Sequence, residues 1–123
     1  MQLQSHLVFL GVDDNDKAKT FYENILQLKF IGDENGTLLF ALDDTVLRIS
    51  MIPDFAPQAF TVLGWNVTDI ESAVNQLQGN NVEIIQYPHM PQDENGIATL
   101  GNVRIVWFKD PAGNVLSLTE MVH

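Results

Sequence analysis

Residues 107–118 read WFKDPAGNVLSL, two apolar strand-like runs joined by a tight turn. In that turn Asp110 stands first, Pro111 second and Gly113 fourth, an order that favours a type I turn. The stretch therefore predicts a hairpin whose strands cover residues 103–109 and 114–120.

A second hairpin is expected in the first half of the chain, with strands over residues 37–42 and 45–51 joined at residues 43–44. A shorter apolar run precedes each hairpin, at residues 28–31 and again at residues 82–85. The two halves of the chain thus share one order of strand-like segments.

Two helices are predicted at matching places, each after a strand-like segment. Asp14 and Asp69 stand where the helix N-caps belong, because their carboxylates can accept from exposed backbone N–H groups. Helical spacing then gives each helix one apolar face. The faces consist of Ala18, Phe21, Tyr22 and Ile25, and of Ile70, Ala73, Val74 and Leu77.

This order predicts an α+β protein in which a strand–helix–strand–strand–strand module occurs twice. We expect a single domain over residues 1–123, with one module at about 1–52 and the other at about 58–123. Residues 53–57 are predicted to link them, because two prolines in five residues suit a linker.

Composition limits the classes of function. The 123 residues include 46% apolar residues and no cysteine, and their net charge is −10. A phosphate backbone would be repelled, and no apolar run reaches the length of a membrane span, so we expect neither nucleic acid nor membrane as a partner. The absence of cysteine suits a reducing cytoplasm. The acidity favours either solubility or attraction of a cationic small molecule.

Two segments carry a resemblance to a known family. Residues 21–30, FYENILQLKF, resemble the "FYxxxLGL" segment of the glyoxalase/bleomycin resistance/extradiol dioxygenase (vicinal oxygen chelate) superfamily, and residues 107–118 resemble its "WFKDPDGNxLxL" segment. The resemblance implies two βαβββ modules that form an open, cup-shaped barrel, and it implies a homodimer. Gln27 stands where the family usually has glycine, so it must tolerate or avoid a left-handed conformation.

The resemblance also implies a divalent metal, held by inward-facing strand residues. The corresponding positions here are Leu7, Arg48, Val62 and Ser117, none of which suits a divalent transition metal. We therefore expect no cofactor. A displaced metal set of His6 and Glu120 is the weaker alternative, since strand alternation turns His6 away from Leu7 and Glu120 away from Ser117.

Alternation predicts that the cup has an apolar lining with a few polar groups, which is typical of a small-molecule site. Its predicted ligand-binding residues are Leu7, Phe9, Arg48, Ser50, Val62, Asn66, Ser117 and Thr119. Gly11 and Gly64, in matching strands, either leave room for a ligand or permit close packing. Because an unpaired buried charge is costly, Arg48 either binds a ligand anion, pairs with an internal carboxylate or lies at an exposed rim position.

A polar loop over residues 86–96 offers two further candidates. Tyr87 and His89 either reach a ligand as acid–base groups or are exposed loop residues. Strand parity places Trp65 on the helix-facing side of its strand, and it leaves Trp107 open.

Together these features favour a metal-independent small-molecule-binding protein that sequesters a drug or metabolite. The alternative is a glyoxalase- or lyase-type enzyme with a displaced divalent-metal site, and a third reading is an inactive interaction module. The residues do not decide whether the protein is an enzyme.

Overall fold

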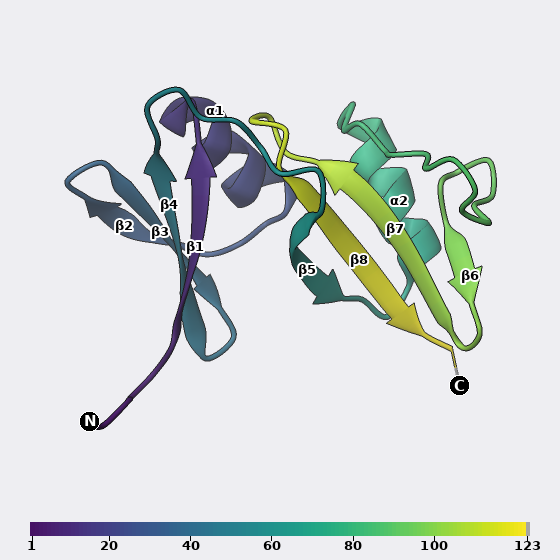
Figure 1. Ribbon diagram of the computed structural model, residues 1–123, viewed down its shortest axis with the longest axis horizontal. Helices are drawn as coiled ribbons and strands as arrows, with labels where there is room; N and C mark the ends of the chain where they lie inside the picture. The colour runs from purple at the N-terminus through teal and green to yellow at the C-terminus, as the bar shows by residue number, and fades with distance from the viewer. Residues whose placement is uncertain (123) are drawn as a thin grey trace. The chain divides into compact units, whose positions relative to one another are not determined.

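The chain folds as two compact units that divide after Pro57, and the computed structural model describes residues 1–122 of them. Each unit holds one four-stranded mixed sheet and one principal helix (Figure 1). The predicted α+β class with two βαβββ modules is confirmed. The joining of the two sheets into one cup, and a single domain with a linker at residues 53–57, stay predictions. The predicted end of the second module, residue 123, lies outside the described residues.

The sheet of the first unit has the strand order β1-β4-β3-β2. Its strands are β1 (Leu7–Val12), β2 (Phe30–Glu34), β3 (Thr37–Leu42) and β4 (Thr45–Met51). β1 pairs with β4 in parallel, and the other pairs are antiparallel. The parallel pair arises because α1 (Asn15–Thr20) and two strands separate β1 from β4 along the chain.

One face of this sheet packs against α1 and the turn after it, and the core of the unit lies there. Leu10 and Val12 of β1 and Leu47 and Ile49 of β4 are buried on that face. Aromatic rings fill the space between helix and sheet, with Tyr22 in contact with the rings of Phe21, at 5.0 Å, and Phe40, at 6.0 Å between centroids.

The first helix is shorter than predicted. An α-helix ends at Thr20, and Phe21–Ile25 continue as a π-helix in which the Leu26 amide donates to the Phe21 carbonyl. The expectation of one continuous amphipathic α-helix is therefore wrong. The apolar face itself is largely kept, since Ala18, Phe21 and Tyr22 are buried while Ile25 is only partly covered. The wider turn accompanies the burial of two consecutive aromatic side chains.

The sheet of the second unit has the order β5-β8-β7-β6. Its strands are β5 (Thr61–Asn66), β6 (Ala98–Leu100), β7 (Val103–Lys109) and β8 (Val115–Met121). The helix α2 (Ile70–Gly79) packs on β7 and β8 (Figure 1). Again the pair formed by the first and last strands is parallel.

The predicted caps and turn are confirmed. The Asp14 carboxylate accepts from the Lys17 amide at 3.0 Å, and that of Asp69 accepts from the Ser72 amide at 3.1 Å. In the β7–β8 turn, the buried Asp110 carboxylate accepts from the Asn114 amide at 2.8 Å. These carboxylates satisfy backbone donors at the ends of the elements that position the sheets.

Two short strands differ from their predicted places. β2 begins and ends later than the predicted run at residues 28–31. Residues 82–85 form only an isolated bridge, from Ile84 to Phe108, because β6 pairs with the other end of β7 instead. β6 was missed, since a strand of three residues has too little alternation to stand out from the loop before it.

Gln27 adopts the left-handed conformation, with φ of 61°. The exposed Gln27 lets the Leu28 amide donate to the Tyr22 carbonyl at the end of the helix. We predict that Gln27→Gly raises the free energy of unfolding by about 0.5–1 kcal/mol, because glycine adopts this conformation without a steric cost.

Urea unfolding measures this change, and Gln76→Gly is the matched control. Gln76 is exposed within α2, where glycine should lower the free energy of unfolding by about 1 kcal/mol. Equal losses in the two variants would show that the conformation at Gln27 carries no strain.

Candidate ligand-binding face

The first sheet has one face that no helix covers within its unit. Strand alternation and the parallel register bring three pairs together on this face: Leu7 beside Val46, Phe9 beside Arg48, and Gly11 beside Ser50. We call these six residues the free face of the first sheet. The predicted ligand-binding residues Leu7, Phe9, Arg48 and Ser50 are thus on one surface, and their contact with a ligand stays a prediction.

Large apolar side chains on the free face are exposed. Phe9 exposes 67% of its surface and Leu7 49%. The guanidinium carbon of Arg48 lies 6.0 Å from the centroid of the Phe9 ring, within the range of a cation–π contact. An apolar ring and a cation therefore stand side by side.

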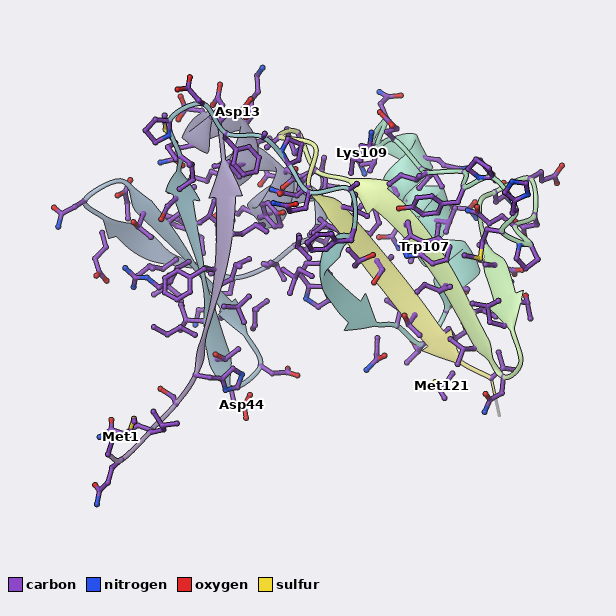
Figure 2. All side chains as sticks on the ribbon, viewed as in Figure 1. Met1, Asp13, Asp44, Trp107, Lys109 and Met121 are labelled. Carbon is purple, nitrogen blue, oxygen red and sulfur yellow. The ribbon has the colours of Figure 1, made fainter. Side chains whose placement is uncertain are left out.

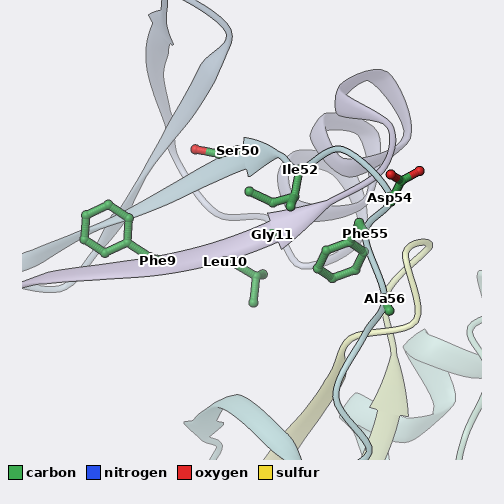
Figure 3. Close-up of a pocket in the computed structure, with 8 residues that line it drawn as sticks. All are labelled: Phe9, Leu10, Gly11, Ser50, Ile52, Asp54, Phe55 and Ala56. Atoms are coloured by element: carbon green, nitrogen blue, oxygen red, sulfur yellow. The ribbon is translucent and has the colours of Figure 1, made fainter.

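An open pocket of about 440 Å³ lies at the Phe9–Gly11 end of β1 (Figure 3). The pocket is mostly apolar, and one acidic residue lies at its edge. Its lining consists of Phe9, Leu10, Gly11, Ser50, Ile52, Asp54, Phe55 and Ala56. Two predicted site residues, Phe9 and Ser50, therefore reach a real depression in the surface.

Half of this lining comes from a segment in which the sequence predicted no site residue. Ile52, Asp54, Phe55 and Ala56 fall in or beside the predicted linker, whose prolines suggested a segment without a site of its own. The segment instead folds back beside β1 (Figure 3). Phe55, a large apolar residue within a predicted linker, was the available signal.

The two glycines permit close packing. A methyl group on Gly11 would come within 2.8 Å of the Phe55 ring and 3.0 Å of the Ile52 side chain. A methyl group on Gly64 would overlap the hydroxyl oxygen of Ser117. The space beside each glycine is thus taken by protein atoms, and at Gly11 those atoms form the pocket wall.

Two pairs of polar side chains meet on the face of the sheet that carries Arg48 and Ser50. Arg48 Nη2 lies 3.8 Å from Glu34 Oε1, and the hydroxyl oxygens of Thr37 and Ser50 lie 3.3 Å apart. Glu34 reaches this face from β2, and Thr37 from β3. The internal salt bridge expected for Arg48 therefore exists, but as a long one.

The second sheet carries the remaining predicted strand residues. Asn66 pairs with Thr119, and Gly64 with Ser117, on the face away from α2. A bulge between Thr61 and Leu63 leaves Val62 without a register partner on β8, so an unbroken count by twos does not hold through β5. The place of Val62 in the ligand-binding lining stays a prediction.

The side chains at the family's metal positions do not fit a metal ion. Leu7 is an exposed alkyl group, Arg48 is a cation, and Ser117 is 8% exposed and packs against Gly64. Val62 has no donor atom. Within residues 1–122, no three His, Cys, Asp or Glu side chains gather closely enough to hold an ion.

Glu120 and His6, the alternative ligands, have other surroundings. Glu120 Oε1 accepts from the Ile70 amide at 2.8 Å, at the start of α2, and Glu120 Oε2 lies 3.7 Å from Arg104 Nη1. As predicted, Glu120 is on the face opposite Ser117. His6 is exposed before β1, and its backbone carbonyl accepts from the Thr45 hydroxyl.

The arginine beside Glu120 forms the stronger ion pairs of the two arginines. Arg104 Nη2 donates to Glu71 Oε1 at 3.0 Å, and this hydrogen bond raises the pKa of the Arg104 guanidinium. Nearby Glu120 adds to the effect. This cluster joins β7 and β8 to the first turn of α2.

The two loop candidates, Tyr87 and His89, have different surroundings. The Tyr87 ring packs edge-on against Trp107, with 5.2 Å between centroids. Trp107, labelled in Figure 2, is on β7, where it pairs with Ser117 of β8. His89 is exposed and has a positive φ of 69°. Trp65 is half-buried opposite Leu118, on the helix-facing side as predicted.

Comparisons with known proteins agree with the fold. The sequence model of the Glyoxalase/Bleomycin resistance protein/Dioxygenase superfamily matches residues 4–118. A search of curated proteins found no match.

Similar folds occur among solved structures. TnmS3, an antibiotic binding protein from Streptomyces sp. CB03234, is 25% identical with a TM-score of 0.69, covering 98% of this chain and 99% of its own. FosX, a fosfomycin resistance protein from Listeria monocytogenes, is 16% identical with a TM-score of 0.75, covering 98% and 94%. A lactoylglutathione lyase from Agrobacterium tumefaciens is 16% identical with a TM-score of 0.72, covering 95% and 92%.

We predict that Gly11→Ala lowers the free energy of unfolding by about 1–3 kcal/mol, because the added methyl group displaces Phe55 and Ile52. In a Phe55→Ala background the same change should cost less, a coupling that a double-mutant cycle with urea unfolding measures. Gly32→Ala is the control, since nothing lies within 4 Å of a methyl group there. Equal costs at Gly11 and Gly32 would contradict the close packing.

Glu120 should act as a structural group whether or not a divalent ion is present. Glu120→Ala is predicted to lower the free energy of unfolding by about 1–3 kcal/mol, since it removes a charge-assisted hydrogen bond to the start of α2. Glu120→Gln, which keeps the acceptor oxygen, should lose less. Thermal unfolding with and without EDTA measures this. A loss that chelation abolishes would make Glu120 a metal ligand instead.

Proposed function

Since the chain belongs to the Glyoxalase/Bleomycin resistance protein/Dioxygenase superfamily, we propose that it binds and sequesters a small drug-like molecule or metabolite without a metal ion. The ligand lies on the free face of the first sheet. Its apolar part covers Phe9 and enters the pocket beside Phe55.

The observation that carries this proposal is the exposure of Phe9 beside that pocket. Burying a side chain such as phenylalanine is worth roughly 1.5–3 kcal/mol, so its exposure on a sheet face favours a ligand that covers it. The pocket walls Ile52 and Phe55 offer further apolar surface, and Arg48 and Ser50 offer polar groups for orientation. Apolar walls with a few polar groups are typical of ligand sites.

Metal independence rests on the donor set. The family's metal positions carry Leu7, Arg48, Val62 and Ser117, which supply one hydroxyl and no carboxylate or imidazole. The alternative, a glyoxalase- or lyase-type enzyme, would need a displaced metal site that includes Glu120. The Glu120 carboxylate already accepts from the Ile70 amide and pairs with Arg104, which disfavours that alternative.

The antibiotic binding protein TnmS3 supports the binding of a small molecule, since it is 25% identical over nearly the full length of both chains. The two proteins that are 16% identical support the fold alone. A homodimer and a cytoplasmic location are parts of the same proposal. In the described residues, no helix is long and apolar enough to cross a membrane.

An NMR titration of ¹⁵N-labelled protein with 2-naphthamide, a neutral aromatic probe, tests the proposal. In the presence of EDTA the probe should shift the amide signals of Phe9, Gly11 and Ser50. Phe9→Ala should weaken binding about tenfold or more, the equivalent of a large part of the burial of one aromatic side chain.

Phe60→Ala is the matched control. Phe60 is 63% exposed, a fraction similar to the 67% of Phe9, but it belongs to the second unit. Its replacement should leave the affinity unchanged. Probe binding that requires added Zn²⁺, or that shifts signals only outside the free face, would contradict the proposal.

A further inference from the structure

Arg48 has hydrogen-bonding capacity that the protein does not use. A guanidinium carries five N–H donors. Among the described residues its one ion-pair partner is Glu34, whose oxygen at 3.8 Å is too distant for a hydrogen bond. The Arg48 side chain is only 26% exposed, while Glu34 is 61% exposed and largely in solvent.

Arg104, in the same chain, is an arginine whose guanidinium has close carboxylate partners. Its side chain is similarly covered, at 24% exposed, yet it donates to Glu71 at 3.0 Å and lies 3.7 Å from Glu120. Glu71 is in α2 and Glu120 is in β8, so both partners belong to the same unit as Arg104. Because Arg48 lacks such a pair, its planar donor edge is available for an external anion.

The aromatic neighbour of Arg48 narrows the chemistry of that anion. The Phe9 ring is exposed on the same face, 6.0 Å from the guanidinium carbon. A ligand ring that packs on Phe9 would carry a ring-attached acidic group directly toward Arg48. One flat molecule can then satisfy both residues.

A second donor stands next to Arg48 along the strand. Ser50 follows on the same face of β4, about 7 Å away by strand geometry. Its hydroxyl is within 3.3 Å of the Thr37 hydroxyl. When Thr37 donates to Ser50, the Ser50 hydroxyl can donate to an oxygen of the ligand.

Charge at the other end of the pocket sets the orientation of the ligand. Asp54 lines the pocket beside Phe55, so an anionic group is repelled there and the apolar part is favoured. The net charge of −10 acts weakly at the site, because physiological salt screens exposed charges beyond about 8 Å. Local charges therefore decide: the carboxylate of Asp54 lines the pocket, and the cation beside the Phe9 ring is Arg48.

We propose that the ligand is an aromatic carboxylate whose ring packs on Phe9 and whose carboxylate binds Arg48, with Ser50 as a further donor. This inference rests on the proposed function and names its class of ligand. It assigns Arg48 to the ligand, in place of the long ion pair with Glu34.

The test compares 2-naphthoate with 2-naphthamide, which have the same ring and differ in charge. In NMR titrations of the full chain at neutral pH with EDTA, wild-type protein should bind 2-naphthoate at least tenfold more tightly. Arg48→Met should bring the ratio of the two affinities close to one, and Phe9→Ala should weaken both probes. Retained dispersion of the amide signals shows that each variant is folded.

Lys17→Met is the matched control. It removes one positive charge from an exposed residue of α1, and α1 lies on the other side of the sheet from the free face. It should keep the ratio of wild type. Equal affinities in wild type, with binding that still depends on Phe9, would overturn the carboxylate and leave the proposed function standing. The carboxylate would also be overturned if the ratio of 2-naphthoate to 2-naphthamide affinity fell equally in Arg48→Met and in Lys17→Met. If neither probe shifts the signals of the free face, both proposals are wrong.

Discussion

The parallel pairing of β1 with β4 determines which residues of the first unit are buried and which are available. In this register Leu47 and Ile49 lie under the helix, and Arg48 lies on the opposite face beside Phe9. A slip of one residue would expose two fully buried aliphatic side chains and bury a guanidinium. The hydrophobic core thus fixes the composition of the candidate site on the other side of the same sheet.

The two units share one fold, but their arginines and glycines make different contacts. In the second unit Arg104 and Glu120 tie the sheet to α2, and Ser117 packs closely against Gly64. In the first unit Arg48 has no close partner, and Gly11 lets Phe55 form a pocket wall. The two modules therefore differ in their arginines, because Arg104 of the second has a close carboxylate partner and Arg48 of the first has only a distant one.

Much of this arrangement could be predicted from the sequence, because alternation and capping act over a few residues. Phe9, Arg48 and Ser50 were placed on one face by counting along strands, and Asp14 and Asp69 by their positions before apolar helices. What failed depended on packing between distant segments. The bulge at Val62 and the return of Phe55 onto β1 are set by neighbours that no local pattern reveals.

A crystal structure of the chelator-treated protein with bound 2-naphthoate would test the central claim most directly. The account predicts electron density for the ring against Phe9 and for the carboxylate at Arg48, in a protein without a divalent ion. Density for a cation held by His6 or Glu120, or a probe bound only away from the first sheet, would contradict it.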